Sequence, residues 1–205
     1  MCSSDLGELL GTLELGVPGL HNLSNALAAV AVGRFIGLPF EGISESLKIF
    51  RGAGRRFQLR GEVNGIRVID DYAHHPSEIK ATLKAAGQVK TGRVVGVFQP
   101  HRYTRTSILS ERFGEAFTDA DVIIISDIYS AGERPIQGFS ANIIVSAIEK
   151  HEGREVVYLP TRQEIVDYLA KTARPGDMIV TMGAGDIWNA GVELVSRLKE
   201  RHEIG

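Results

Sequence analysis

Short, continuous apolar runs alternate with amphipathic segments along the chain from Phe57 onward. Uninterrupted apolar runs are typical of parallel strands that are buried on both faces. They predict strands at 93–98, 121–126, 155–159 and 178–182. The amphipathic segments predict helices at 76–88, 107–118, 140–150, 162–171 and 187–201. This alternation predicts an α/β fold with a mainly parallel sheet flanked by helices.

A hairpin is predicted to precede these units. The segments "QLRGEV" and "IRVIDD" flank Asn64-Gly65, and Asn-Gly is a strong signal for a two-residue turn. Upstream, the pattern predicts a helical hairpin, 22–37 and 40–50, that has no sheet of its own. The glycine-rich, basic segment "RGAGRR" is typical of a linker. We therefore expect two domains, 1–56 and 57–205.

Composition narrows the class of protein. The chain has 205 residues, a formal net charge of −2 and 43% hydrophobic residues, as in ordinary globular proteins. The charge balance does not favour nucleic acid or an anionic membrane as a partner, and no apolar run approaches the length of a membrane span. Cys2 is the single cysteine, so we expect a reducing compartment, the cytoplasm.

The first six residues, "MCSSDL", match the translated end of a common sequencing adapter joined to a start codon. We interpret residues 1–6 as an assembly artefact and expect the natural protein to extend upstream.

Polar loops follow the predicted strands, at the sheet edge where α/β proteins bind their ligands. These loops are "DYAHHP" after 66–70, "QPHRYTR" after 93–98, "DIYSAGERPI" after 121–126 and "GAGD" after 178–182. The last lacks the full G-x-G-x-x-G spacing and indicates a tight turn rather than a phosphate site.

Two of these loops carry candidate chemistry. Asp71, His74 and His75 are suitable metal ligands, but no second ligand cluster accompanies them, so we predict no metal site. Alternatively, Asp70 or Asp71 caps the next helix and Pro76 occupies its first turn. A cap needs only one short acceptor, so two histidines would stay unexplained.

Arginines and asparagines supply the other candidates. Arg102 and Arg105 would share one helix face and could clamp a carboxylate or phosphate, although two solvated arginines are the simpler alternative. Asn22 is typical of a helix cap, and Asn25 of an amide that contacts a purine edge. Arg55 and Arg56, taken alone, are typical of a solvated linker.

Three motifs in this order, HN-x-x-N-A, G-x-G-R-R-F and D-D-Y-A-H-H-P, resemble the Mur ligases, the ATP-dependent amino-acid ligases of peptidoglycan synthesis. "FQPHRYTR" and "YSAGERPI" are similar to the members that join L-alanine to UDP-N-acetylmuramic acid. The resemblance runs from about Leu13 to the C-terminus. It implies that 1–56 end a truncated central ATPase domain and that 57–205 form a Rossmann-like, amino-acid-binding domain.

The resemblance also implies a mechanism, in which ATP converts the muramoyl carboxylate to an acyl phosphate that the amine of L-alanine attacks. Carried over by motif, Asn22 and Asn25 contact adenine or orient nearby groups. Arg56 contacts the ATP phosphates and acts in catalysis, and Asp71 holds the ribose or the network on the ATP side and is also catalytic. No Gly-Lys-Ser or Gly-Lys-Thr occurs, so the P-loop and the Mg²⁺ ligands are expected upstream.

On the amino-acid side, the resemblance implies that His74 lies near the amine as a catalytic group, and that Arg102 and Arg105 hold the carboxylate of L-alanine. Tyr72, His75 and Glu133 are expected close by, without an assigned role. We expect the fragment to be inactive alone. The alternatives are a ligase that recycles murein tripeptide and a non-catalytic module that binds an amino acid or a nucleotide.

Overall fold

The computed structural model describes residues 2–3, 9–50 and 53–204. They form two compact units, Met1–Gly54 and Arg55–Gly205. The unit boundary falls two residues before the one expected from the sequence. That the first unit ends an ATP-binding domain stays a prediction.

Unit 1 is a pair of helices with a small ladder. Helix α1 spans Leu20–Phe35 and α2 spans Phe40–Ile49, close to the predicted ranges. Their core is small and is formed by Val30, Phe40 and Ile43 with Leu10, Leu13 and Leu47 packed against it. Strand β1, Cys2–Ser3, pairs antiparallel with β2, Leu9–Gly11. The other residues of the suspected artefact, 1 and 4–6, lie outside the described residues.

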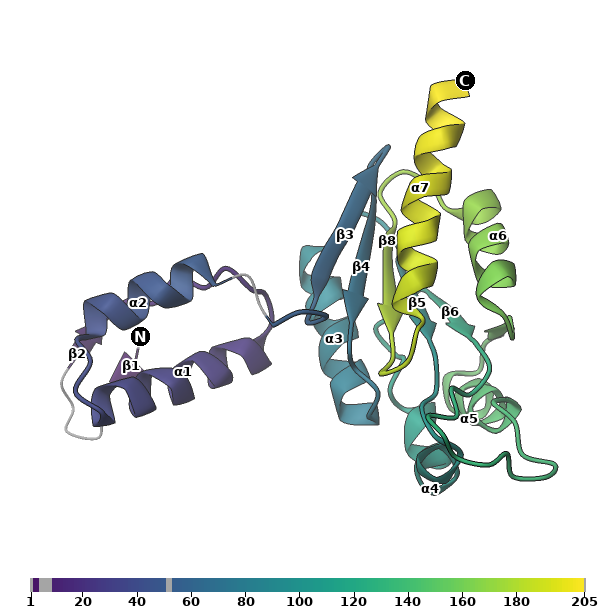
Figure 1. Ribbon diagram of the computed structural model, residues 1–205, viewed down its shortest axis with the longest axis horizontal. Coiled ribbons are helices and arrows are strands. Elements are labelled where there is room, and N and C mark those ends of the chain that lie inside the picture. The colour runs from purple at the N-terminus through teal and green to yellow at the C-terminus, as the bar shows by residue number, and fades with distance from the viewer. Residues whose placement is uncertain (1, 4–8, 51–52, 205) are drawn as a thin grey trace. The chain divides into compact units, whose positions relative to one another are not determined.

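Unit 2 is built on a six-stranded sheet with the order β3-β4-β8-β5-β6-β7 (Figure 1). The strands are β3 Gln58–Val63, β4 Ile66–Asp71, β5 Val94–Phe98, β6 Val122–Ile125, β7 Val157–Tyr158 and β8 Met178–Met182. Only β3 runs antiparallel to its neighbour; the pairs from β4 to β7 are parallel. The predicted mainly parallel α/β sheet is confirmed.

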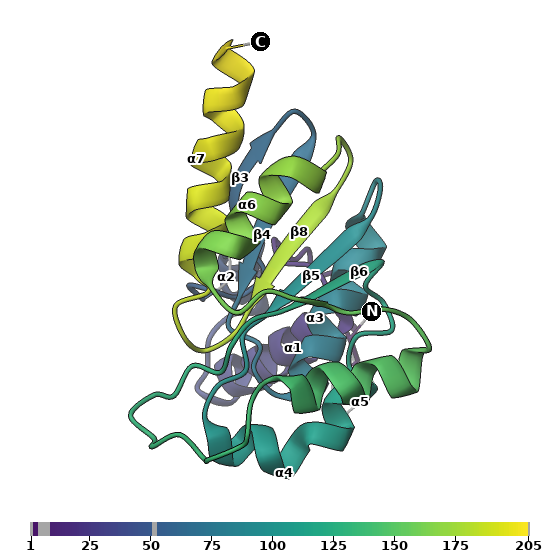
Figure 2. The same ribbon diagram turned by 90° about the vertical axis from the view of Figure 1, so that its right-hand side faces the viewer.

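Helices cover both faces of this sheet (Figures 1 and 2). The helices are α3 Pro76–Val89, α4 Tyr103–Gly114, α5 Asn142–Glu152, α6 Arg162–Thr172 and α7 Trp188–Ile204. Side chains of α3, α4 and α5 share one buried cluster with the sheet, and those of α6 and α7 share the other. The inner strands β5 and β6 carry no polar side chain, because each face meets a helical layer.

The β3–β4 hairpin turns at Asn64-Gly65, as predicted. Asn64 has φ 51° and Gly65 has φ 73°, so both central residues adopt the left-handed conformation of a type I′ turn. The turn sets the register, in which Val63 pairs with Ile66.

Helix α4 begins at Tyr103, whereas the sequence predicts a start at 107. A distant side chain explains the difference. The Glu133 carboxylate accepts hydrogen bonds from the Thr104 N–H, at 3.0 Å, and from the Thr104 hydroxyl, at 2.6 Å. A carboxylate at a helix N-terminus satisfies free amides and favours the helix dipole. Local pattern could not reveal a cap that comes from another loop.

Helix α3 is capped by His75 rather than by Asp70 or Asp71, so that cap prediction is wrong. The His75 Nδ1 atom accepts from the Ser77 N–H at 3.4 Å, and Glu78 accepts from the His75 N–H at 3.2 Å. Pro76 occupies the first turn, as predicted. Across the part of the chain that the structure describes, no helix is long and apolar enough to cross a membrane.

The aromatic centre of the α4–α5 layer should carry much of the stability of unit 2. Phe117 is fully buried, and its ring centroid lies 5.7 Å from that of Phe98. We expect Phe117→Ala to lower the free energy of unfolding by about 3–5 kcal/mol, because it removes apolar contacts and leaves a cavity. Urea denaturation measures this. The control Ile108→Ala, at a site 79% exposed, should change stability by no more than about 0.5 kcal/mol; similar losses for both variants would contradict the packing described.

Candidate functional site

The loops that follow β4, β5 and β6 meet at the carboxyl edge of the sheet. The rings of His74 and His101 lie 6.1 Å apart, from the first two loops. His101 and Tyr129 form an isolated parallel bridge that links the second loop to the third. The structure therefore brings together the strand-end loops that the sequence marked as candidates.

His101 is the centre of this group, although sequence reasoning did not select it. Its Nδ1 atom lies 3.2 Å from Arg105 Nη1, and its ring stacks on Tyr129 with centroids 5.7 Å apart. An arginine only donates, so Nδ1 acts as the acceptor and neutral His101 carries its proton on Nε2. Its position directly before Arg102 in "QPHRYTR" is the signal that could have identified it.

The environment keeps His101 neutral. Burial lowers the pKa of the His101 imidazole, and the nearby charges of Arg105, His74 and Arg102 lower that pKa further. Glu133 acts in the opposite direction. The geometry agrees, since Arg105 Nη1 lies 3.2 Å from His101 Nδ1 and the His74 ring lies 6.1 Å from the His101 ring.

Arg102 and Arg105 follow His101 in the chain but lie in different backbone settings. Arg102 is exposed and precedes α4, with φ 71°, and its N–H donates to the Tyr129 carbonyl at 2.8 Å. Arg105 is half-buried within the first turn. The expectation that both share a helix face is therefore wrong, because Arg102 lies outside the helix. Left-handed backbone at a non-glycine residue costs about 1–3 kcal/mol and is concentrated at functional sites.

His74 is held by its backbone surroundings. Its Nδ1 atom lies 2.9 Å from the Tyr72 carbonyl oxygen and 3.3 Å from Glu78 Oε2. Both partners accept, so Nδ1 carries a proton and Nε2 of the neutral ring is left as an acceptor. The Tyr72 and His74 rings pack edge to face, with centroids 5.3 Å apart.

Asp71 lies at the end of β4 and is buried. Its Oδ2 atom accepts the Phe57 N–H at 2.7 Å, and its Oδ1 atom accepts the Ala73 N–H at 2.8 Å. Burial raises the pKa of the Asp71 carboxyl, while the two N–H donors and Arg56 act against that rise. The carboxylate thus fastens two loops; contact with a nucleotide stays a prediction.

Two neighbouring arginines at the start of unit 2 both lie near the Tyr72 ring but differ in burial, and the Arg55 guanidinium is 5.1 Å from the ring centroid. Arg56 is exposed, with its guanidinium 5.6 Å from the centroid of the Tyr72 ring. Arg55 turns inward and pairs with the fully buried Asp70 at 3.0 Å. The solvated-linker interpretation is therefore wrong for Arg55.

The remaining candidates belong to unit 1. Asn22 lies inside α1, whose N-cap is Gly19, so the expected cap role of Asn22 is wrong. Its Nδ2 atom donates to the Pro18 carbonyl at 2.6 Å, and Asn25 is exposed. Neither is placed relative to unit 2, and their contact with adenine stays a prediction.

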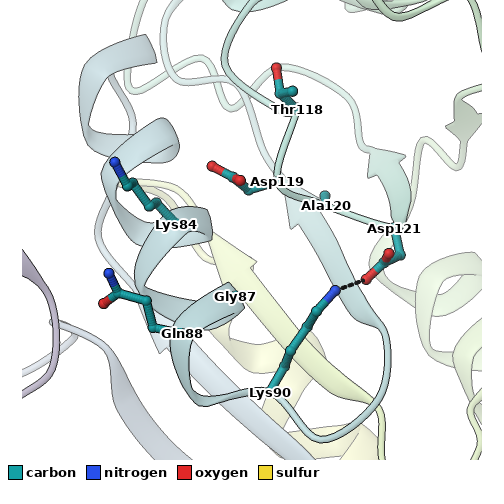
Figure 3. A pocket seen from close by; sticks show the side chains of 8 residues that line it. All are labelled: Lys84, Gly87, Gln88, Lys90, Thr118, Asp119, Ala120 and Asp121. Atoms are coloured by element: carbon teal, nitrogen blue, oxygen red, sulfur yellow. Dashed lines mark hydrogen bonds and ion pairs between the residues drawn. The ribbon is translucent and has the colours of Figure 1, made fainter.

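Neither a cluster of metal ligands nor the cavity shown in Figure 3 lies at the carboxyl edge in the described residues. Among residues 2–3, 9–50 and 53–204, no three His, Cys, Asp or Glu side chains gather as metal ligands. An open cavity of about 400 Å³ lies at the opposite edge, beside the amino ends of β5 and β6 (Figure 3). Lys90 there pairs with Asp121 at 2.8 Å. The candidate site is therefore the carboxyl edge.

We expect the His101 ring to titrate below its ordinary pKa of 6.5. In the unfolded chain the ring binds its proton more readily, so neutral His101 stabilises the fold above about pH 6.5 and this contribution is lost as the pH falls through the folded pKa. NMR titration of the ring protons measures the midpoint.

Arg105→Gln should move this midpoint upward, because it removes one neighbouring cation. Arg112→Gln is the matched control: Arg112 is an exposed arginine in the last turn of the same helix. A midpoint at or above 6.5 in the unsubstituted chain would contradict the assignment.

Comparison with known proteins places this geometry in a family. The family described as "Mur ligase, glutamate ligase domain" matches residues 55–185. A UDP-N-acetylmuramate–L-alanine ligase from Pelotomaculum thermopropionicum is 81% identical over 199 residues, which is 97% of this chain and 43% of the relative. One from Desulforamulus reducens is 56% identical and covers 95% of this chain and 42% of the relative.

Solved structures agree with these relatives. The crystal structure of the UDP-N-acetylmuramate–alanine ligase from Thermotoga maritima is 31% identical, with a TM-score of 0.73, over 92% of this chain and 40% of that one. A murein peptide ligase from Psychrobacter arcticus is 27% identical, with a TM-score of 0.66, over 91% and 38%. The match across 55–185, which spans the sheet and the loops at its carboxyl edge, shows that the chain belongs to the Mur ligase family.

Proposed function

We propose that this chain supplies the amino-acid-binding part of a ligase that joins L-alanine to UDP-N-acetylmuramic acid with ATP. The chain spans about 43% of the length of the curated relative most like it among those described above, so the activity of a whole enzyme is part of the proposal. One observation carries it: at the carboxyl edge of the sheet, Arg105 Nη1 lies 3.2 Å from His101 Nδ1 and the His74 ring lies 6.1 Å from the His101 ring, with Arg102 next to His101 in the same loop.

This arrangement suits a small amino acid. The guanidinium groups of Arg102 and Arg105 offer paired donors to a carboxylate, and a charge-assisted contact of this type is worth about 1.5–3 kcal/mol. Neutral His101 adds no competing charge. Tyr129, stacked on His101 at 5.7 Å, gives the group an apolar wall.

The amine of the amino acid would meet His74. Because His74 Nδ1–H donates to the Tyr72 carbonyl at 2.9 Å, its Nε2 can accept a hydrogen bond from the amine and orient its lone pair. ATP would supply the phosphoryl group that converts the muramoyl carboxylate into an acyl phosphate. The contribution of these residues is positioning of the amine and neutralisation of charge.

On the nucleotide side, exposed Arg56 is the residue of unit 2 that we propose contacts the ATP phosphates. Asp71 would act near the ribose while it holds the Phe57 and Ala73 amides. Asn22 and Asn25 would contact adenine. Among the described residues, no three His, Cys, Asp or Glu side chains gather into a cluster that could hold Mg²⁺. We therefore expect the ligands of Mg²⁺ elsewhere in the enzyme.

The recycling of murein tripeptide is the alternative reaction. The murein peptide ligase structure resembles this chain somewhat less than the alanine ligase structure, with TM-scores of 0.66 and 0.73. The "FQPHRYTR" loop also favours alanine addition. Since the proposed reaction uses ATP and a UDP-linked sugar, we propose that it takes place in the cytoplasm.

The proposed contact of Arg102 and Arg105 with the alanine carboxylate, called the clamp below, can be tested directly. In a complete ligase that carries this segment, Arg102→Ala or Arg105→Ala should raise the KM for L-alanine about tenfold to a hundredfold and change the KM for ATP much less. Lysine should restore part of the affinity, because it keeps the charge but loses the planar pair of donors. Steady-state kinetics with each substrate varied in turn provides the measurement.

Arg112→Ala is the matched control for the clamp, since Arg112 is an exposed arginine in the same helix. Its KM values should stay close to those of the unsubstituted enzyme. If both clamp variants keep a native KM for L-alanine, the amino-acid assignment is wrong.

A further prediction concerns the catalytic activity of the 205-residue chain by itself. The purified 205-residue chain should neither hydrolyse ATP nor form UDP-N-acetylmuramoyl-L-alanine, because no Gly-Lys-Ser or Gly-Lys-Thr of a P-loop occurs in it. Product analysis by mass spectrometry tests this, with a full-length relative as the positive control. Turnover by the chain alone would refute the proposal that the ATP-phosphate and Mg²⁺ sites lie outside it.

A further inference from the structure

Arg55 uses its whole guanidinium group inside unit 2. Its Nε atom donates to Asp70 Oδ2 at 3.0 Å, Nη1 to the Gly185 carbonyl at 3.1 Å and Nη2 to the Gly183 carbonyl at 2.6 Å. Its side chain is 21% exposed, and the Asp70 carboxylate is fully buried. One side chain therefore ties the first residue of unit 2 to the ends of β4 and β8.

The backbone around Arg55 is fastened as well. The Arg55 carbonyl accepts the Tyr72 N–H at 2.7 Å, the Arg55 N–H donates to Gln58 Oε1 at 3.0 Å, and the Phe57 N–H donates to Asp71 at 2.7 Å. These bonds connect segment 55–58 to the loop that follows β4. That loop carries the proposed amino-acid contact His74.

The conformation held in this way is unfavourable by itself. Arg55 has φ 59° and Phe57 has φ 46°, so two non-glycine residues in the left-handed region flank Arg56. Such backbone persists only where surrounding contacts impose it. The contacts of Arg55 and Asp71 are those that impose it here.

Arg56 projects outward from between these two fixed residues. It is exposed, and its guanidinium lies 5.6 Å from the centroid of the Tyr72 ring. Tyr72 in turn packs on His74, which lies 6.1 Å from His101. The direction of Arg56 is thus set within the same rigid frame as the amino-acid pocket.

We propose that Arg55 is a positioning residue of the ligase, which holds the strained turn at 55–57 so that Arg56 is directed from the edge of unit 2 beside the amino-acid pocket. This inference rests on the proposed function, in which Arg56 contacts the ATP phosphates. Neither the family resemblance nor the sequence pattern assigned a role to Arg55. Pre-organisation of a charged group by its supporting contacts lowers the cost of aligning the reactants.

The chain offers variants that separate side chain from backbone. Arg55→Gly removes the guanidinium but suits a positive φ, so it tests the contacts without added backbone strain. Arg55→Lys keeps a charge for Asp70 but cannot reach three acceptors with a planar group. Asp70 keeps Arg60 at 2.9 Å and the Thr181 hydroxyl at 3.1 Å in either variant, so its buried charge retains partners.

The first measurement is hydrogen exchange of the 205-residue chain. In Arg55→Gly, the amides of Tyr72 and Phe57 should exchange at least about tenfold faster, while core amides of β5 and β8 keep their protection. In Arg55→Lys, the exchange rates of these two amides should lie between those of the unsubstituted chain and those of Arg55→Gly. Arg112→Ala is the matched control and should leave both amides unchanged, because Arg112 is an exposed arginine in the last turn of α4.

The second measurement is steady-state kinetics of a complete ligase that carries the same substitutions. Arg55→Gly should lower kcat about tenfold or more and change the KM for L-alanine by less than about threefold, since Arg102 and Arg105, the proposed contacts of the alanine carboxylate, lie elsewhere, at the start of α4. Arg55→Lys should restore part of kcat. A role in folding alone would lower the amount of active enzyme but would not give this split.

The outcomes distinguish the two proposals. Unchanged exchange of Tyr72 and Phe57 in Arg55→Gly, or faster exchange with an unchanged kcat, overturns the positioning role of Arg55 and leaves the proposed function standing. A native kcat in Arg56→Ala overturns the phosphate role of Arg56, and the positioning role of Arg55 in the reaction falls with it. Faster exchange together with a selective loss of kcat supports both.

Discussion

Two adjacent carboxylates, Asp70 and Asp71, end strand β4, and the arrangement around the candidate site depends on how they are satisfied. Both are buried. A buried carboxylate without partners costs several kcal/mol, so each must find donors. Asp70 takes them from Arg55, Arg60 and Thr181.

Asp71 takes its donors from the backbone on either side of it. The Phe57 and Ala73 amides bind its two oxygens, so the segment that enters unit 2 and the loop that leaves β4 are fixed to one side chain. Because successive residues of a strand point to opposite faces, the pair fastens structure on both sides of the sheet. The loops must keep one geometry, because only that geometry supplies hydrogen-bond donors to both buried carboxylates.

The parallel sheet supplies the second condition for the site. Its parallel strands end in three polar loops at one edge of the sheet. His101 and Tyr129 form a β-bridge between two of these loops, and the Arg102 N–H donates to the Tyr129 carbonyl at 2.8 Å. Glu133 completes the connection when it accepts the Thr104 amide and so starts α4 beside the pocket. Candidate site residues on loops are thus positioned by the sheet.

Local pattern by itself determined the order of helices and strands, the parallel sheet, the type I′ turn at Asn64-Gly65 and the edge at which the candidate loops meet. Each follows from periodicity or turn chemistry within a short window. The motifs also indicated the family and most candidate residues, among them His74, Arg102 and Arg105. That information is carried by neighbours in the chain.

Only the tertiary structure decided which of these residues meet and how. Glu133 caps α4 from 29 residues away, and Arg55 reaches Gly185 across 130 residues. His101 became the centre of the candidate site, and Arg55 became a half-buried anchor rather than a solvated linker residue, through contacts with other loops. Such contacts depend on the packing of distant segments, and a pattern read along the chain contains no measure of distance between them.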